Sequence, residues 1–287
     1  MASVCDTLIT HPNVVNGAMM YWPMENVLYT EGYALDMFGA GEWGLLPVQT
    51  GGHRIGLLLD RAMSDDLITR HLQVADAARA TLGINVCDYI VTERPVNVSV
   101  AVAPSGASYG TIEDVDTLVD AASRLVEEAR CTAIAVVCRF PEDETEEEAE
   151  LTKQYVSGGG MDPVGGAEAI ISHLLTQKFR IPVAHAPAND VAASPDKDVA
   201  PKAAAEELGF TFLPCVLAYL HRAPVIVESR DDDLAGKAIW AQDVDSFVVP
   251  LTSAGGMACL SLGWQSDALV VAVEENETLM QVTFPLV

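Results

Sequence analysis

Three residues of the chain combine a suitable chemical type with a position beside an apolar stretch: His11, His185 and Glu275. His185 directly follows the strand predicted at 181–184, and Glu275 follows the apolar strand predicted at 268–273. His11 lies in a loop between an apolar and a polar stretch. The carboxyl ends of parallel strands meet at one edge of a sheet, where reactive side chains gather. Imidazole and carboxylate groups in one cleft act as general acids and bases, so we predict catalytic roles for these three residues if the fold brings them together.

Two glycine-rich turns lie next to predicted strands and helices, at 157–166 and 253–256. Backbone N–H groups at the start of a helix bind carboxylate or phosphate groups, so each turn is a candidate anion site. The alternatives are tight packing for 253–256 and a flexible connection for 157–166. Polar residues near these turns and near the predicted catalytic residues complete the candidate site. The predicted ligand-binding residues are Asn13, Asn16, Gly159, Asp162, Ser253, Gly255, Gly256, Asn276 and Thr278.

The sequence names no cofactor and predicts no metal site. Histidine pairs with the spacing HExxH or HxH, which support zinc, are absent from the sequence. A P-loop GxxxxGKS is also absent. Ser105 and Ser253 lie in glycine turns, where serine is a common turn residue, so a nucleophilic role is not predicted for either. His173 lies within the apolar sequence ISHLL and is predicted to be a core residue with a satisfied imidazole.

The charge of the chain excludes two classes of partner. The sequence contains 41 acidic and 16 basic residues, which gives a formal net charge of −25. Nucleic acids and anionic membranes need clustered Lys and Arg side chains, so neither is an expected partner. The acidic runs are predicted to form a solvated surface, as in proteins from a salty environment.

Location and redox state follow from what the sequence lacks. No apolar run reaches the roughly eighteen residues that span a bilayer, and no leader peptide is recognised at the start of the chain. The six cysteines are scattered without a CxxC pair, which indicates free thiols in a reducing compartment. We therefore expect a cytoplasmic protein that does not contact a membrane.

Strands alternate with helices along most of the chain, which predicts an α/β fold with a mainly parallel sheet and helices on both faces. The clearest helices are expected at 64–82, capped by Ser64 and ended by Gly83, and from Thr111 onwards. The apolar run 132–138 is typical of a central strand covered on both faces. Residues 21–47 have neither helical nor strand periodicity, so a long packed loop is expected there. We predict one α/β domain over 1–287, with two lobes that would divide near 141–160.

Five stretches of the chain carry a resemblance to a known family: DTLITHPNVVNGAMMYWPMENVLYTEGYALDMFGAGEWGL, HLQVADAARATLGINV, GGGMDPVGGAEAIISHLL, AAAEELGFTFLPCVLAYLHRAP and VVPLTSAGGMACLSL with VVAVEENETLM. They resemble a domain of unknown function found in cyanobacteria and plastid-bearing organisms, and the resemblance covers nearly the whole chain. It implies a photosynthetic source and supplies no activity. It also implies an additional strand and glycine-rich loop before the region of Val4, which this chain is expected to lack.

Three functions are compatible with these observations. The first is an enzyme that acts on a small anionic metabolite held at the glycine turns, with histidine or glutamate transferring a proton. The second is a metabolite-binding or regulatory protein without catalysis, and the third is a structural partner. The high apolar content and the aromatic region at 21–43 also favour a homo-oligomer.

Overall fold

The computed structural model describes residues 1–11, 20, 23–48, 51–105, 107–140, 146–157, 162–188, 211–233, 236–276 and 278–283. The chain divides into two compact units. The first contains Met1–Glu31 and Val48–Ala223, and the second contains Gly32–Pro47 and Pro224–Val287. The division expected near 141–160 falls inside the first unit.

The first unit is built on a parallel sheet of four strands in the order β5-β4-β8-β9. Its strands are β4 (Ile55–Leu59), β5 (Val86–Val91), β8 (Ala133–Arg139) and β9 (Val183–Ala188). All of β4 and the first six residues of β8 are buried, as expected for central strands of a sheet that is covered on both faces.

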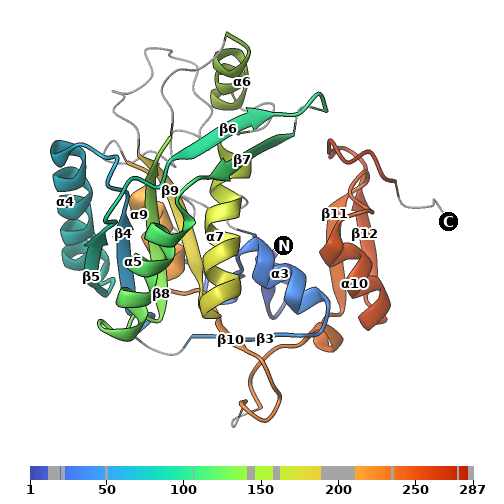
Figure 1. Ribbon diagram of the computed structural model, residues 1–287. Coiled ribbons are helices and arrows are strands. Elements are labelled where there is room, and N and C mark those ends of the chain that lie inside the picture. Colours follow the sequence, from blue (N-terminus) through green and yellow to red (C-terminus); the bar gives the residue numbers. More distant parts are fainter. Residues whose placement is uncertain are drawn as a thin grey trace. The chain divides into compact units, whose positions relative to one another are not determined.

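Helices cover both faces of this sheet, which confirms the predicted fold class (Figure 1). Residues of α4 (Asp65–Leu82) and α9 (Leu213–Leu220) share a hydrophobic core with one face. Residues of α5 (Val115–Glu127) and α7 (Gly165–Phe179) share a second core with the other face. Alternate residues of β8 supply the two cores because successive strand side chains point to opposite faces.

Capping residues set the ends of two of these helices. Ser64 Oγ accepts a hydrogen bond from Leu67 N at the start of α4, and Gly83 ends the helix with a left-handed φ of 67°. Both caps were predicted. For α5 the expected start at Thr111 is wrong, because Asp114 is the cap and accepts from Thr117 N at 3.1 Å.

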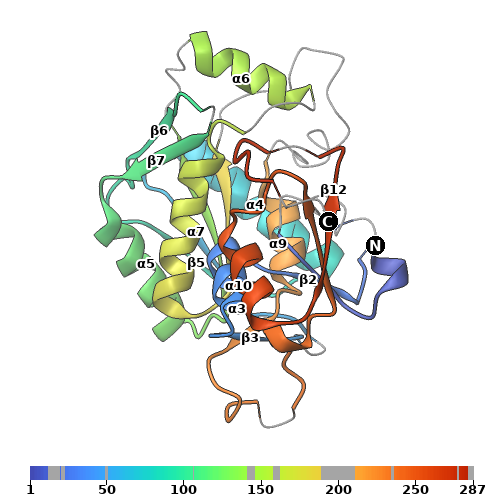
Figure 2. The same ribbon diagram turned by 90° about the vertical axis from the view of Figure 1, so that its right-hand side faces the viewer.

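Residues just before α5 belong instead to a two-stranded antiparallel hairpin. It consists of β6 (Val98–Val102) and β7 (Ser108–Ile112), and it packs against α7 through β7 (Figure 2). The first unit also contains a helix α6 (Glu146–Val156) and a short 3-10 helix η1 (Ala2–Val4).

The expected long loop at 21–47 is wrong. This stretch contains β2 (Val27–Tyr29), α3 (Gly32–Gly39) and β3 (Gly44–Leu46). Strands of three residues are too short to show a period, and each is held by a partner that lies elsewhere in the sequence. In the first unit β2 pairs in parallel with β1 (Leu8–Thr10), and in the second β3 pairs antiparallel with β10 (Val225–Val227).

The remaining elements of the second unit follow β10. They are a 3-10 helix η3 (Ala241–Asp243), β11 (Ser246–Pro250), α10 (Met257–Gln265) and β12 (Leu269–Val273). Strands β11 and β12 pair in parallel, and α10 connects them. Helix α10 also packs against α3, where a Cβ added to Gly39 would lie 3.2 Å from Ala258 Cα.

Candidate functional site

Six ionisable or polar side chains form one group in the first unit. We call it the histidine cluster, and its members are His11, Glu31, Glu168, Ser172, His173 and His185.

Two parallel strands and one helix bring these residues together. Thr30 N donates to Thr10 O, so His11 and Glu31 follow β1 and β2 at the same edge of the small sheet. Glu168 and Ser172 are four residues apart on α7, which places them on one face of the helix. This helix packs against β9, the strand that carries His185.

The contacts inside the cluster run from one residue to the next. His173 Nε2 lies 3.0 Å from Glu31 Oε1, and Ser172 Oγ lies 3.4 Å from the same carboxylate oxygen. Ser172 Oγ is also 3.1 Å from His185 Nδ1, whose Nε2 lies 3.7 Å from Glu168 Oε2. The residues therefore connect α7 to β9 and to the segment after β2.

Burial decides the charge of two of the histidines. Burial, together with the neighbouring His11 and His173, lowers the pKa of His185 to about 3. Burial also lowers the pKa of His11 to about 4, because it outweighs the opposing effect of Glu31. Both imidazoles are therefore neutral at physiological pH, and each keeps a ring nitrogen that can accept a hydrogen bond.

Exposure distinguishes the remaining members of the cluster. The side chain of His173 is 41% exposed, whereas that of Glu31 is 4% exposed. Ser172 is 2% exposed, so a substrate cannot reach its hydroxyl group, although Ser172, His185 and Glu168 are arranged in the order of a catalytic triad. Among these side chains, the imidazole of His173 is the most exposed, and that of His185 is 20% exposed.

The structure brings together two of the three predicted catalytic residues, His11 and His185. Glu275 lies in the second unit, in the exposed turn after β12, together with the exposed Asn276. The predicted ligand residues Asn13, Asn16 and Gly159 lie outside the described residues.

Asp162 has a local contact at the start of α7. Its Oδ1 accepts from Val164 N at 3.0 Å, and its backbone oxygen accepts from Gly165 N at 3.2 Å. These bonds form the turn that precedes the helix.

The backbone of the glycine turn at 253–256 is held by bonds within the second unit. Ser253 N, Ala254 N and Gly256 N donate to carbonyl oxygens of Pro250, Val282 and Ser253. A Cβ added to Gly255 would lie 3.1 Å from Met280 Sδ. Thr278 Oγ1 donates to Thr252 O at 3.1 Å, which fixes the following segment against the turn. These contacts favour the packing alternative over anion binding.

Sequence reasoning missed Glu31, Glu168, Ser172 and His173 as parts of a site. The prediction that His173 is a core residue is wrong, because its side chain is exposed on one side and contacts Glu31. The signal that could have found three of them is the spacing of Glu168, Ser172 and His173, which places polar groups close together on an otherwise apolar helix.

Two spacings that match known motifs lie in the wrong structural context. GAGEWG at 39–44 matches GxGxxG, but it leads from α3 into β3, whereas a dinucleotide loop leads from a strand into a helix. GASYG at 106–110 matches GxSxG, but Ser108 begins β7 of the hairpin, and its Oγ accepts from Gly166 N at 3.0 Å.

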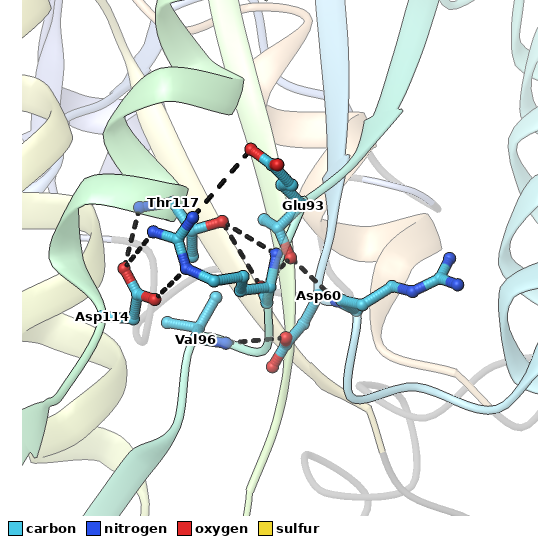
Figure 3. Close-up of polar contacts among 8 residues, drawn as sticks. Asp60, Glu93, Val96, Asp114 and Thr117 are labelled. Atoms are coloured by element: carbon cyan, nitrogen blue, oxygen red, sulfur yellow. Dashed lines mark hydrogen bonds and ion pairs between the residues drawn. The ribbon is translucent and has the colours of Figure 1, made fainter.

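The carboxyl edge of the main sheet is occupied by a structural carboxylate, Asp60 (Figure 3). Asp60 is fully buried, and its Oδ1 accepts from Ala62 N and Val96 N, each at 3.0 Å. Its Oδ2 accepts from Arg139 N at 3.1 Å. Three backbone donors from three segments bind this side chain, so it connects the ends of β4 and β8 to the start of β6.

A second set of bonds lies beside Asp60. Arg94 makes a two-pronged contact with Asp114, through Nε at 2.7 Å and Nη2 at 3.0 Å (Figure 3). Thr92 Oγ1 accepts from Arg61 N and donates to Arg94 O, each at 2.8 Å. This part of the edge anchors loops.

Within the described part of the chain, no group of three or more His, Cys, Asp or Glu side chains is arranged to hold a metal ion. Likewise, none of the helices described is long and apolar enough to cross a membrane.

Comparison with known proteins finds a family profile and a relative. The profile of the family described as "Protein of unknown function (DUF3326)" matches residues 1–286. An uncharacterized lipoprotein of the cyanobacterium Synechococcus sp. is 48% identical over 281 residues, which are 98% of this chain and 75% of that protein. No solved structure matches.

Proposed function

This chain belongs to the family of proteins of unknown function DUF3326, and we propose from the histidine cluster that it is an enzyme that transfers protons to or from a small polar molecule. His173 exchanges the proton with the substrate, and Glu31 orients His173. Resemblance to the family adds no reaction, so the proposal rests on the geometry of the cluster.

The observation that carries the proposal is the contact between His173 Nε2 and Glu31 Oε1 at 3.0 Å. A buried carboxylate that binds one imidazole nitrogen fixes the orientation of the ring and stabilises the imidazolium that forms when the ring accepts a proton. The half-exposed position of His173 makes the ring accessible to a small molecule.

The other members support this role. Ser172 connects Glu31 to His185 through contacts of 3.4 and 3.1 Å, so a proton can be redistributed behind His173 along hydrogen bonds. The neutral His185 and His11 supply hydrogen-bonding groups for binding.

The charge of the cluster favours a neutral or cationic substrate over the anionic one expected from the glycine turns. Glu31 and Glu168 are carboxylates, and two of the three histidines are neutral, so the cluster does not supply the positive charge that an anion requires. The N–H groups of the turn at 253–256 are also largely used within the second unit.

The test compares the wild-type chain with His173→Gln and Glu31→Gln in a metabolite extract, with substrate loss followed by mass spectrometry. We expect the wild type to consume at least one small polar metabolite, and His173→Gln to reduce its turnover by about 100-fold or more. Gln177→Ala, an exposed change on the same helix, is the matched control and should keep full turnover.

Full turnover by His173→Gln would overturn the proposal. A metabolite that binds saturably to the wild type and is never converted would support the non-catalytic binding function instead.

The relative's name bears on where the protein acts. Because the Synechococcus protein is named a lipoprotein, we propose an association with a membrane through a lipid anchor in place of the cytoplasmic location expected from the sequence. Detergent phase partitioning of the natural protein distinguishes the two, because a lipid-anchored protein enters the detergent phase.

A further inference from the structure

Two cysteine thiols meet across a strand of the main sheet. Cys87 lies in β5 and Cys131 lies just before β8, and β4 separates these two strands in the sheet. Their Sγ atoms are nevertheless only 3.0 Å apart. Cys131 is 4% exposed, and Cys87 is partly exposed.

A β-bulge and a glycine create this contact. Ile55 pairs with Val86 and Gly56 pairs with Asp88, so Cys87 is the additional residue of β5 at a bulge. Bulges redirect side chains out of the regular alternation of a strand. A Cβ added to Gly56 would lie 2.8 Å from Cys131 Sγ, so only glycine at this position of β4 leaves space for the sulfur.

We propose that Cys87 and Cys131 are a modification site that forms a reversible disulfide when an azo or peroxide oxidant reaches the protein. In the reaction with the azo compound diamide, Cys87 Sγ adds to one nitrogen of the N=N bond. Cys131 Sγ then attacks Cys87 Sγ, one Sγ–Sγ bond forms, and the hydrazine leaves with the two hydrogens of the thiols. The two sulfurs are oxidised by two electrons in total and the azo group is reduced by two.

The positions of the two thiols set the order of these steps. Cys87 reacts first because it is the more exposed of the two. Burial, together with Cys87, raises the pKa of Cys131, so this thiol is the slower of the two to react and loses its proton to the departing nitrogen as it attacks. Closing the bond requires the sulfurs to approach by about 1 Å. Cys131 lies in the turn between α5 and β8, outside any helix or strand, so that turn can supply the movement.

The test treats the reduced full-length protein with diamide under native conditions, removes the reagent, and alkylates the remaining thiols after unfolding. We expect four of the six cysteines to be alkylated and a peptide that joins Cys87 to Cys131, which is released by a phosphine reductant. Cys131→Ala should lose this peptide, and Cys259→Ser, which alters a thiol of the second unit, should keep it.

Alkylation of all six cysteines in the treated wild type would overturn the proposal. So would a disulfide that joins any other pair. Both outcomes are read from the wild-type protein, so a variant that fails to fold does not affect the result.

Discussion

Individual residues in the histidine cluster differ in how far the sequence could identify them. His185 was predicted because it follows a strand, and strand ends place side chains at an edge of a sheet. His11 was predicted because it lies in a loop between an apolar and a polar stretch. Glu31 has no comparable signal, because the three-residue strand before it shows no period. Its contact with His173 depends on tertiary packing between two segments that lie 142 residues apart in the sequence.

The low pKa of His185 predicts a pH-dependent stability. In the unfolded chain its pKa is near the ordinary 6.5, whereas in the folded protein it is about 3. The unfolded chain therefore binds a proton that the folded chain does not, and the free energy of unfolding falls as the pH is lowered through 6.5. We expect the contribution of His185 to the free energy of unfolding to be about 1–2 kcal/mol smaller at pH 5 than at pH 8.

Urea unfolding of the wild type and His185→Gln at pH 8 and pH 5 measures this difference. The variant should lose less stability on acidification, because glutamine binds no proton, while Gln177→Ala should follow the wild type. Parallel losses in all three proteins would contradict the low pKa. The charged and titratable neighbours His11, His173, Glu31 and Glu168 are unchanged in this comparison.

At the scale of elements, the strands and helices of the first unit were predictable where a period extends over many residues. Helix α4 is an example, because its period and its capping residues define it locally. Strand β8 is defined locally as well, by its continuous apolar run. The strands at 27–46 are held by partners elsewhere in the sequence, so local patterns missed them. The hairpin is a local pairing of β6 with β7, and the helix start expected at Thr111 falls inside β7. Local patterns also could not predict the histidine cluster, because it forms only where α7 packs against β9 and against the segment after β2.

The junction between α7 and the hairpin depends on Gly166. From the sequence, the glycines of this turn could serve either the close approach of a ligand or a flexible connection. A Cβ added to Gly166 would lie 2.2 Å from the Ser108 carbonyl oxygen. Gly166→Ala must therefore separate the start of α7 from β7, and we expect a loss of about 1–3 kcal/mol in the free energy of unfolding.

Gly165→Ala is the matched control for this prediction. Its added Cβ would lie 3.4 Å from Asp162 Cβ, which is an ordinary contact, and alanine favours the helix. Chemical unfolding of both variants provides the comparison. Equal stability of Gly165→Ala and Gly166→Ala would show that the close approach to β7 has no energetic role.

At the scale of the whole molecule, the second unit exposes apolar side chains on a parallel pair of strands. Leu269 is 66% exposed on β12, and Trp264 is 89% exposed on α10. Parallel strands are normally covered on both faces, and large exposed apolar patches mark contact surfaces. This agrees with the homo-oligomer expected from the composition, which stays a prediction.

We expect light scattering after size-exclusion chromatography to give a mass above that of one chain. Leu269→Lys should shift the protein towards the monomer, because a charged group on an apolar contact is costly to bury. Tyr109→Lys, which changes an exposed apolar residue of the first unit, is the control. A wild type that is monomeric at every concentration would refute the oligomer.

The division of the chain into units also governs the order in which they are completed during synthesis. Strand β3 leaves the ribosome roughly 180 residues before β10, its antiparallel partner. All segments of the first unit have been made once Ala223 has emerged. At that point β3 is still without β10, and α3 is still without α10, against which it packs. Once residue 223 has emerged, a nascent chain can therefore already form the histidine cluster, while the edge of β3 stays open to aggregation until β10 has been made.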